Sequence, residues 1–215
     1  MKVAGIDEAG KGPVVGSMFV AGVLMDETKI PLLRKIGVRD SKKLSPKQRA
    51  RLAGEIRKLA EKYFVLEVKA HQIDELRKVM TMNELMVDCY VKVLGELSPE
   101  CAYVDAADVV AARFGKNILE KYGKKVMLFS EHNADETYPI VSAASILAKV
   151  SRDMSVLSLS RTIGKDIGSG YPSDPATLEF LKEWVRVHGS LPDFVRHSWE
   201  TSRTVLAMSK QKTLC

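Results

Sequence analysis

The sequence predicts an α/β protein whose mixed β-sheet carries helices on its faces, and three observations support this. Two apolar strands, at residues 2–9 and 17–25, come first and are joined by a connection of hairpin length. The later strands alternate with segments of helical periodicity, a pattern that adds parallel strands to a sheet. Hydrophobic residues form 46% of the 215-residue chain and charged residues 28%, as in folded globular proteins.

The first clear helix is predicted to begin after Ser45. Ser45 suits the N-cap, Pro46 the first helical position, and Gln48 completes a capping box. Apolar residues then follow helical spacing: Leu52, Ile56, Leu59 and Tyr63. Residues 63–68 read as the strand that follows this helix.

The second half of the chain alternates helices with strands. We expect Asn83 to cap a helix and Pro139 to lie near the start of another. The apolar face of the earlier helix comprises Met86, Tyr90, Val93 and Leu97. Between the two helices we expect strands at 101–105 and 125–130 and a helix at 109–121. The small side chains of residues 142–148 would let the later helix lie close against the sheet.

Composition and charge exclude several classes of protein. Lys and Arg number 33 against 27 Asp and Glu, a net charge of +6 that favours an anionic partner. The three cysteines show no C-x-x-C spacing, which disfavours a zinc site or a disulfide framework and favours a reducing compartment. The longest mostly apolar stretch, residues 13–25, is too short to span a bilayer. We therefore expect a cytoplasmic protein without membrane contact.

The most informative segment follows the first strand. Asp7 and Glu8 come at the strand end, where both carboxylates can reach one rim and suit a hard cation. Gly10, Lys11 and Gly12 follow, and backbone amides beside a lysine suit a phosphate. A nucleotide-binding P-loop is excluded, because Gly12 replaces the required Ser or Thr and two acids would oppose the phosphates.

Two further acids occur near strand ends. Asp105 ends the strand at 101–105, and Asp135 lies between a strand and a helix start. Each acid taken alone is better explained as a helix cap, a role that Asp108 could equally fill beside Asp105. Taken together with Asp7 and Glu8, they would repel one another unless cations neutralised them. Two Mg²⁺ ions held by shared carboxylates are typical of phosphodiester hydrolysis.

Six motifs, in this order along the chain, resemble those of ribonuclease HII, the type 2 ribonuclease H family. They are Gly5-Ile6-Asp7-Glu8-Ala9-Gly10-Lys11-Gly12, Asp40-Ser41-Lys42-Lys43-Leu44, Tyr103-Val104-Asp105, His132-Asn133-Ala134-Asp135, Ser142-Ala143-Ala144-Ser145-Ile146-Leu147-Ala148-Lys149 and Gly168-Ser169-Gly170-Tyr171-Pro172-Ser173-Asp174. The resemblance covers nearly the whole chain, from residue 3 to about residue 175.

The resemblance implies a ribonuclease H-like fold with a five-stranded mixed sheet. The catalytic domain would span residues 1–163, and a helical C-terminal extension with the substrate-sensing tyrosine loop would span residues 164–215. The family hydrolyses RNA in RNA–DNA hybrids and cuts 5′ of ribonucleotides embedded in duplex DNA, leaving 3′-hydroxyl and 5′-phosphate ends. Its four catalytic, metal-binding acids correspond to Asp7, Glu8, Asp105 and Asp135, which would hold Mg²⁺ or Mn²⁺, two ions in the reactive complex.

The resemblance also implies a site that senses the 2′-hydroxyl separating RNA from DNA. The glycines at 10 and 12, with Lys11, would let the backbone approach a sugar-phosphate, and Tyr171 would stack on the sugar or base. Without the family, Tyr171 would be read as a loop aromatic packed on the core. Lys43 and Lys149, inside family-like motifs, are candidate phosphate contacts.

Two other functions stay open from the residues alone. One is another ribonuclease H-like two-metal nuclease of the resolvase type, which would also cleave all-DNA substrates. The other is a non-catalytic duplex-binding module, which the four acids disfavour. Some relatives end in a Gln-x-x-Leu segment and two aromatic residues that dock on the DNA sliding clamp. Here Gln211 and Leu214 are present without the aromatic pair, which disfavours clamp binding, and we expect a monomer.

Overall fold

A five-stranded mixed sheet organises the chain in the computed structural model, which describes residues 1–38 and 44–212, with side chains to residue 209. The strand order is β3-β2-β1-β4-β5. The strands span Lys2–Ala9 (β1), Met18–Asp26 (β2), Lys62–Val68 (β3), Cys101–Asp105 (β4) and Met127–Glu131 (β5). This confirms the fold class predicted from the sequence and its family resemblance.

The sheet is mixed because β1 pairs differently on its two sides. β1 runs antiparallel to β2, with Lys2 opposite Asp26 and Ala9 opposite Phe19. On its other side β1 runs parallel to β4, with Ile6 opposite Val104, and β4 is parallel to β5. The parallel pairing ends at Ile6 and Val104, so Asp7 and Asp105, the next residues of β1 and β4, come to the same edge of the sheet.

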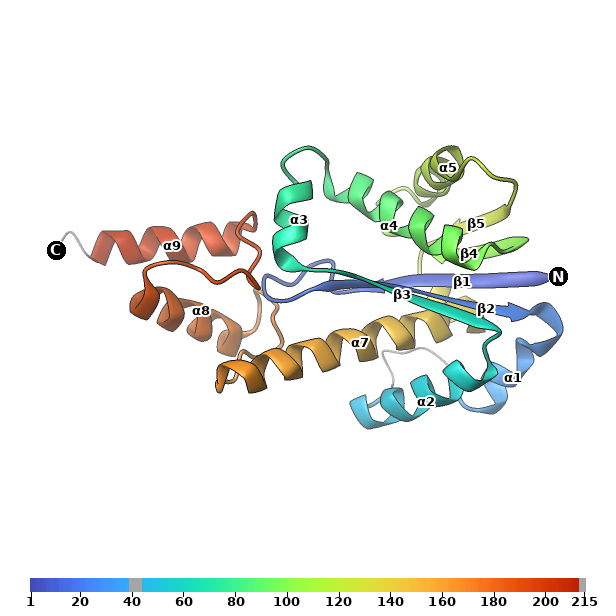
Figure 1. The fold of residues 1–215 in the computed structure, drawn as a ribbon, viewed down its shortest axis with the longest axis horizontal. Coiled ribbons are helices and arrows are strands. Elements are labelled where there is room, and N and C mark those ends of the chain that lie inside the picture. Colours follow the sequence, from blue (N-terminus) through green and yellow to red (C-terminus); the bar gives the residue numbers. More distant parts are fainter. Residues whose placement is uncertain (39–43, 213–215) are drawn as a thin grey trace. The chain divides into compact units, whose positions relative to one another are not determined.

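Helices fill the chain between and after the strands (Figure 1). They are α1 (Pro31–Lys35), α2 (Pro46–Leu59), α3 (Ala70–Leu76), α4 (Met82–Leu97), α5 (Ala111–Tyr122), α6 (Ala134–Thr137), α7 (Pro139–Ile163), α8 (Pro175–His188) and α9 (Glu200–Lys212), with a 3₁₀ turn at Glu27–Lys29. Among the described residues, no helix combines the length and apolar composition that a membrane crossing would require.

Two of the expected helix boundaries are wrong. Thr81 caps α4, not Asn83: its side chain accepts from the backbone of Glu84, which completes a capping box. Helix α2 ends at Leu59, so Tyr63 belongs to β3 alone. The capping box of Ser45 and Gln48 is confirmed. The short helices α1 and α3 have no counterpart among the sequence predictions.

The chain divides into two compact units. The first comprises Met1–Ala9, Phe19–Glu67 and Thr81–Ser151, and the second Gly10–Met18, Val68–Met80 and Arg152–Cys215. In the first unit, α4 and α5 lie on one face of the sheet, with α2 and the start of α7 on the other (Figure 1). Each unit buries its own apolar cluster.

Close packing of α7 on β1 sets the core of the first unit. A Cβ atom at Gly5 would lie under 3.0 Å from backbone atoms of Ile140 and Val141. The small residues Ala143 and Ala144 on α7 are fully buried, in agreement with their predicted contact with the sheet. Glycine in the strand and alanines in the helix thus bring the two backbones together next to Asp7.

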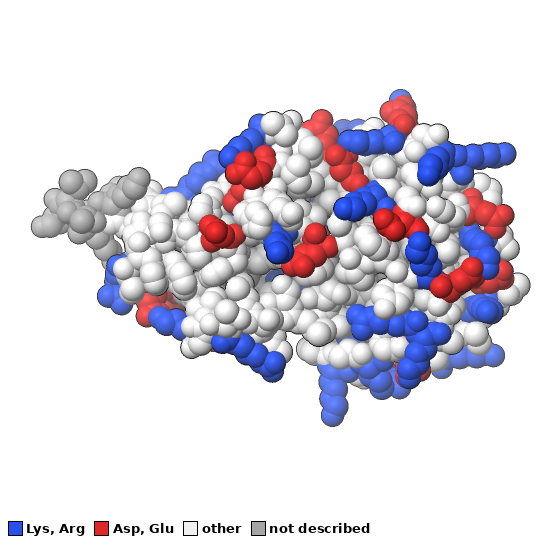
Figure 2. Space-filling model, viewed as in Figure 1, with Lys and Arg blue, Asp and Glu red and all other residues white. Residues whose placement is uncertain are grey.

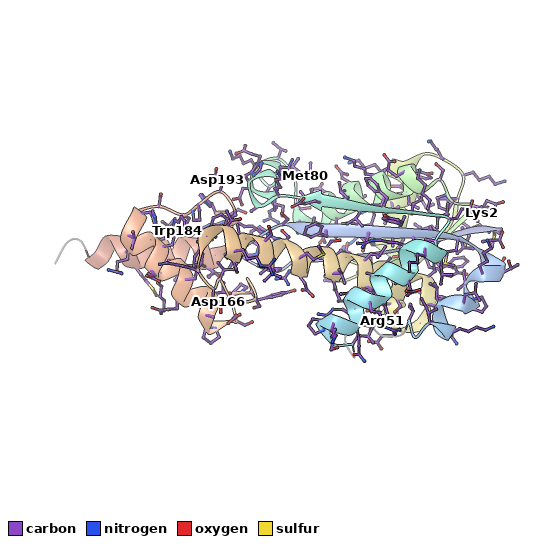
Figure 3. The ribbon with its side chains drawn as sticks, turned by 60° about the horizontal axis from the view of Figure 1, so that its bottom comes forward. Lys2, Arg51, Met80, Asp166, Trp184 and Asp193 are labelled. Carbon is purple, nitrogen blue, oxygen red and sulfur yellow. The ribbon has the colours of Figure 1, made fainter. Side chains whose placement is uncertain are left out.

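The second unit packs its helices around aromatic side chains. Trp184 on α8, labelled in Figure 3, stacks on His188 with ring centres 4.2 Å apart and meets Phe194 edge-on. Val15 forms an isolated antiparallel bridge with Val195, which ties the segment after β1 to the segment before α9. This core supports the glycine turn at residues 10–12.

Candidate active site

Three of the four predicted acids converge at the carboxyl ends of two neighbouring strands. Asp7 and Glu8 come from β1 and Asp105 from the end of β4. One carboxylate oxygen from each lies within 4.8 Å of the others. Asp7 is 3% exposed, and Glu8 and Asp105 are half-buried. Parallel pairing of the strands is what brings residues almost a hundred positions apart to one rim.

The electrostatics of this group favour a cation. Burial raises the pKa of Asp7 well above its usual value, and the neighbouring charges of Glu8 and Asp105 raise it further. Lys149 and a hydrogen bond from Ser145 oppose this shift of the Asp7 pKa. Asp7 therefore resists ionisation unless positive charge is supplied nearby. A donor set made only of oxygen atoms fits a hard divalent ion such as Mg²⁺ or Mn²⁺.

Tyr90 orients the acidic group from α4. Its side chain is fully buried, and its hydroxyl donates to Glu8 Oε2 at 2.7 Å and lies 3.1 Å from the carbonyl oxygen of Asp105. Burial raises the pKa of Tyr90 well above its usual value, and the Glu8 charge adds to the shift, so the phenol stays protonated and can donate. The sequence analysis placed Tyr90 only on an apolar helix face. The available signal was its hydroxyl, which needs a partner when buried.

Asp135 lies outside the three-acid group. It is 3% exposed in the first turn of α6, and its Oδ2 is 4.0 Å from Lys149 Nζ. Lys149 also donates to Ser145 Oγ at 2.5 Å. The Lys149 charge thus acts on both acids: it lies near Asp135, and it lowers the pKa of Asp7.

Asp105 and Asp108 each accept a backbone N–H near a helix start, but neither is the N-cap residue, which is Asn133 for α6 and Val110 for α5. Asp105 Oδ1 accepts from the backbone N–H of Ala134 at 2.8 Å, so it supports the start of α6. Asp108 accepts from the backbone N–H of Val110 and binds the guanidinium of Arg113 at the start of α5. Asp105 still belongs to the acidic group, because one of its carboxylate oxygens lies within 4.8 Å of oxygens of Asp7 and Glu8.

The glycine turn lies in the second unit and is held by a buried arginine. Gly10 has φ +87°, a left-handed conformation that favours glycine. Arg196, fully buried, donates to the carbonyl oxygens of Gly10 at 2.6 Å, Lys11 at 2.9 Å and Gly16 at 3.1 Å. Burial lowers the pKa of Arg196 to about 10, so it is still charged at neutral pH. Nothing near Arg196 in the sequence predicted this contact.

This contact orients the peptides of the turn. In a trans peptide the carbonyl of one residue and the N–H of the next point in opposite directions. Because the carbonyls of Gly10 and Lys11 face the Arg196 guanidinium, the N–H groups of Lys11 and Gly12 point away from it. Backbone N–H groups on the same side of a turn suit an anion or a sugar hydroxyl as acceptor.

Tyr171 lies against this turn. Its side chain is 39% exposed, and its Cε1 atom is 3.8 Å from the position that a Cβ of Gly12 would take. The backbone N–H groups of Val14 and Val15 donate to the carbonyl of Gly170 at 2.9 and 3.1 Å. The structure thus brings the turn and the tyrosine loop together, although about 160 residues separate them in the sequence. Lys43, the other predicted phosphate contact, lies outside the described residues.

Several known proteins similar to this chain are described as ribonucleases H. The family model "Ribonuclease HII" matches residues 4–202. Ribonuclease HII of Methanosarcina barkeri is 53% identical over 213 residues, which covers 95% of each chain. The crystal structure of ribonuclease H2 from Pyrococcus horikoshii has a TM-score of 0.92 at 43% identity, over 98% of this chain and 100% of that one.

A second solved structure agrees with this. Ribonuclease HII in the PCNA:RNase HII complex from Archaeoglobus fulgidus has a TM-score of 0.85 at 46% identity, over 93% of this chain and 96% of that one. The match to the family model, the identity to curated relatives and the shared fold agree along nearly the whole chain. The chain therefore belongs to the ribonuclease HII family and is a ribonuclease H, a hydrolytic nuclease of a divalent-metal-dependent family.

Proposed function

We propose that this ribonuclease H cleaves the RNA strand of RNA–DNA hybrids and also cuts 5′ of single ribonucleotides in duplex DNA, leaving 3′-hydroxyl and 5′-phosphate ends. The observation that carries the second activity is the Tyr171 ring lying against Gly12, on a turn whose carbonyls are held by Arg196. An aromatic ring beside aligned backbone N–H groups offers a surface for stacking and hydrogen bonding to one ribose.

For the hydrolysis, we propose Asp7, Glu8 and Asp105 as the ligands of Mg²⁺ or Mn²⁺, with Asp135 as the fourth acid and two ions in the reactive complex. Divalent ions at such a site activate water and stabilise charge on the phosphate. The protein residues have their own tasks. Tyr90 holds the Glu8 carboxylate in place, and Lys149 offsets negative charge next to Asp135.

For recognition, we propose that the N–H groups of Lys11 and Gly12 and the side chain of Tyr171 detect the 2′-hydroxyl at the junction. The acids and the turn are close in the chain, since one residue separates Glu8 from Gly10. Lys43 and Lys149 are proposed as phosphate contacts. Clamp binding is not part of this proposal, although a relative was solved as a PCNA complex.

The activity is tested with three end-labelled duplexes of one sequence: all DNA, DNA with a single ribonucleotide, and a continuous RNA–DNA hybrid. With Mg²⁺ or Mn²⁺ we expect cleavage of the last two, a single cut 5′ of the ribonucleotide, and loss of cleavage by orders of magnitude in Asp7→Asn. Cleavage of the all-DNA duplex would instead indicate a resolvase-type nuclease. Duplex binding without any cleavage would indicate a binding module.

The recognition site is tested with Tyr171→Ala. Stacking contributes roughly 1–3 kcal/mol per base, so cleavage at a single ribonucleotide should fall about ten- to hundredfold. The continuous hybrid should lose less, because neighbouring 2′-hydroxyls offer alternative registers, and Tyr171→Phe should lie between. Tyr63→Ala is a matched control, since Tyr63 is also an exposed tyrosine, at 43%. Equal losses on both substrates would contradict a role in selecting the junction.

A further inference from the structure

Arg152 makes two contacts to the tyrosine loop of the second unit and lies close to a third residue, Gly170, and no role in the proposed function accounts for them. Its guanidinium carbon lies 4.8 Å from the centre of the Tyr171 ring, within the range of a cation–π contact. Its Nη2 donates to the carbonyl oxygen of Ser169. A Cβ at Gly170 would be 3.5 Å from the same nitrogen. The Arg152 side chain therefore contacts the Ser169 carbonyl and the Tyr171 ring, and it lies next to Gly170 between them.

Arg152 also packs against the glycine turn. The position that a Cβ of Gly10 would take is 3.1 Å from Arg152 Cδ, tighter than ordinary van der Waals contact. Glycine at this position leaves room for the arginine stem, and its φ of +87° is one that other residues rarely adopt. The Arg152 side chain thus touches both halves of the proposed ribose site, the turn through its stem and Tyr171 through its guanidinium.

The charge of Arg152 is poorly compensated within the protein. Its side chain is 11% exposed, and its buried Nε has no hydrogen-bond acceptor among the described residues. The carboxylate of Asp153 is 3.8 Å from Nη1, beyond hydrogen-bond distance. Arg152 also lowers the pKa of Arg196, after the larger effect of burial. An apolar side chain would fill this space at a lower desolvation cost, so stability alone does not explain an arginine here.

We propose that Arg152 is a positioning residue for Tyr171, which holds the ring against the glycine turn before substrate binds. The inference rests on the proposed function of Tyr171 and adds what keeps the ring in place. A ring fixed in advance loses less conformational freedom on binding, so more of the stacking energy reaches the complex. This matters most at a single ribonucleotide, where one 2′-hydroxyl must be read in one register. Arg152 thereby sets the preference for single ribonucleotides over continuous hybrids.

The test is a double-mutant cycle between Arg152→Gln and Tyr171→Ala, with kcat/KM measured on the single-ribonucleotide duplex and on the hybrid. Arg152→Gln should lower kcat/KM on the single-ribonucleotide duplex, relative to kcat/KM on the hybrid, roughly tenfold, by analogy with the loss of one ordered aromatic contact. In the Tyr171→Ala background it should lower the ratio no further, because residues that act through one another are non-additive. Arg152→Lys should recover little, since an ammonium group lacks the planar face that stacks on a ring.

Arg57→Gln is the matched control, because its guanidinium lies 5.8 Å from the Tyr63 ring centre in the first unit. It should leave the ratio unchanged. Thermal unfolding of each variant verifies that it is folded. If Arg152→Gln does not fold, the conservative Arg152→Lys replaces it in the cycle. The salt dependence of duplex binding should be the same for wild type and Arg152→Gln, since the inferred role involves no phosphate contact.

Three results would overturn the inference. If Arg152→Gln has the same kcat/KM ratio as wild type while Tyr171→Ala has a lower one, positioning by Arg152 is refuted and the role of Tyr171 stands. The same drop in both backgrounds, with a salt slope flatter by about one, would make Arg152 a direct phosphate ligand. An unchanged ratio in Tyr171→Ala itself would refute the proposed function and the inference together.

Discussion

At the scale of single residues, the acidic group depends on a neutral side chain that faces it. Glu8 shares its rim with two other carboxylates and accepts from the Tyr90 hydroxyl at 2.7 Å. A buried carboxylate that loses a donor incurs a desolvation penalty of about 1–3 kcal/mol. Tyr90 therefore orients the Glu8 carboxylate and offsets part of the cost of removing that carboxylate from water.

Tyr90→Phe should reduce kcat by about tenfold or more and weaken Mn²⁺ binding, because Glu8 loses the donor that orients it. The aromatic ring remains, so the edge-on contact with Phe114 is kept. Activity and metal affinity, by titration calorimetry, are the measurements. Tyr122→Phe is the control, since that hydroxyl donates weakly to the Leu94 carbonyl at 3.4 Å. Equal kcat in Tyr90→Phe and Tyr122→Phe would rule out the orienting role.

At the scale of elements, the contact of β1 with α7 is close enough to exclude a methyl group. The strand that carries Asp7 is held at that distance by Gly5 and by the small residues of α7. The helix brings Lys149 and Ser145 to the acidic group at the same time. Strand and helix must therefore approach closely for the acids and the lysine to be neighbours.

Gly5→Ala should destabilise the protein by more than about 3 kcal/mol, because its Cβ would meet backbone atoms of Ile140 that cannot move aside as a side chain can. Chemical denaturation measures the free energy of unfolding. Gly54→Ala is the control: Gly54 lies in α2 with nothing within 4 Å of a Cβ, and alanine there should stabilise by up to about 1 kcal/mol. Similar stability of the two variants would argue against the close contact.

The start of α5 carries a pH-dependent contact. Hydrogen bonds from Arg113 lower the pKa of Asp108 to about 2, from a usual value of 3.8. A depressed carboxylate pKa stabilises the folded state above pH 3.8, and this contribution is lost as pH falls toward 2. Asp108→Asn should thus unfold more readily than wild type at pH 7, with a difference that shrinks below pH 3.8. Thermal melts across this range measure it, and a difference independent of pH would refute the ion pair.

At the scale of the whole molecule, the net charge of +6 favours binding to a polyanion, and one helix presents several exposed basic side chains. Figure 2 shows basic side chains gathered over α2. The exposed ones on that helix are Lys47, Arg51, Arg57 and Lys58. A helix with exposed basic residues offers counterion release on contact with a nucleic-acid backbone.

The logarithm of the binding constant for a duplex should fall linearly with the logarithm of salt concentration, and Lys149→Gln should reduce the slope by about one if Lys149 contacts a phosphate. Binding is measured by fluorescence anisotropy with Ca²⁺ in place of Mg²⁺. Lys116→Gln, at an exposed lysine paired with Glu120, should keep the wild-type slope. A Lys149→Gln slope equal to that of wild type would assign Lys149 to the acids alone.

The sequence by itself determined the strands and the residues worth testing, but not the short helices α1 and α3. β1 contains the apolar run of residues 3–6 and β2 that of residues 18–25, and Ser45, Pro46 and Gln48 form a local helix-start signal, so neighbours in the chain suffice to predict them. The family motifs predicted the four acids and Tyr171 as site residues in the same way, from the sequence alone. The cap of α4 was misplaced because Asn83 and Thr81 both suit an N-cap, and Glu84 selects Thr81 through a capping box. The domain boundary at residues 163 and 164 stays a prediction.

Only the tertiary structure decided which residues support the site. Tyr90 reaches Glu8 across 82 positions, and Arg196 reaches Gly10 across 186. Periodicity marks a residue as buried, yet it carries no information on where a hydroxyl or guanidinium finds its partner. Arg152 likewise meets Tyr171 and Gly10 only through the fold. Hydrogen-bond partners of buried polar groups are set by packing between distant segments, so the sequence names the chemistry and the fold supplies its geometry.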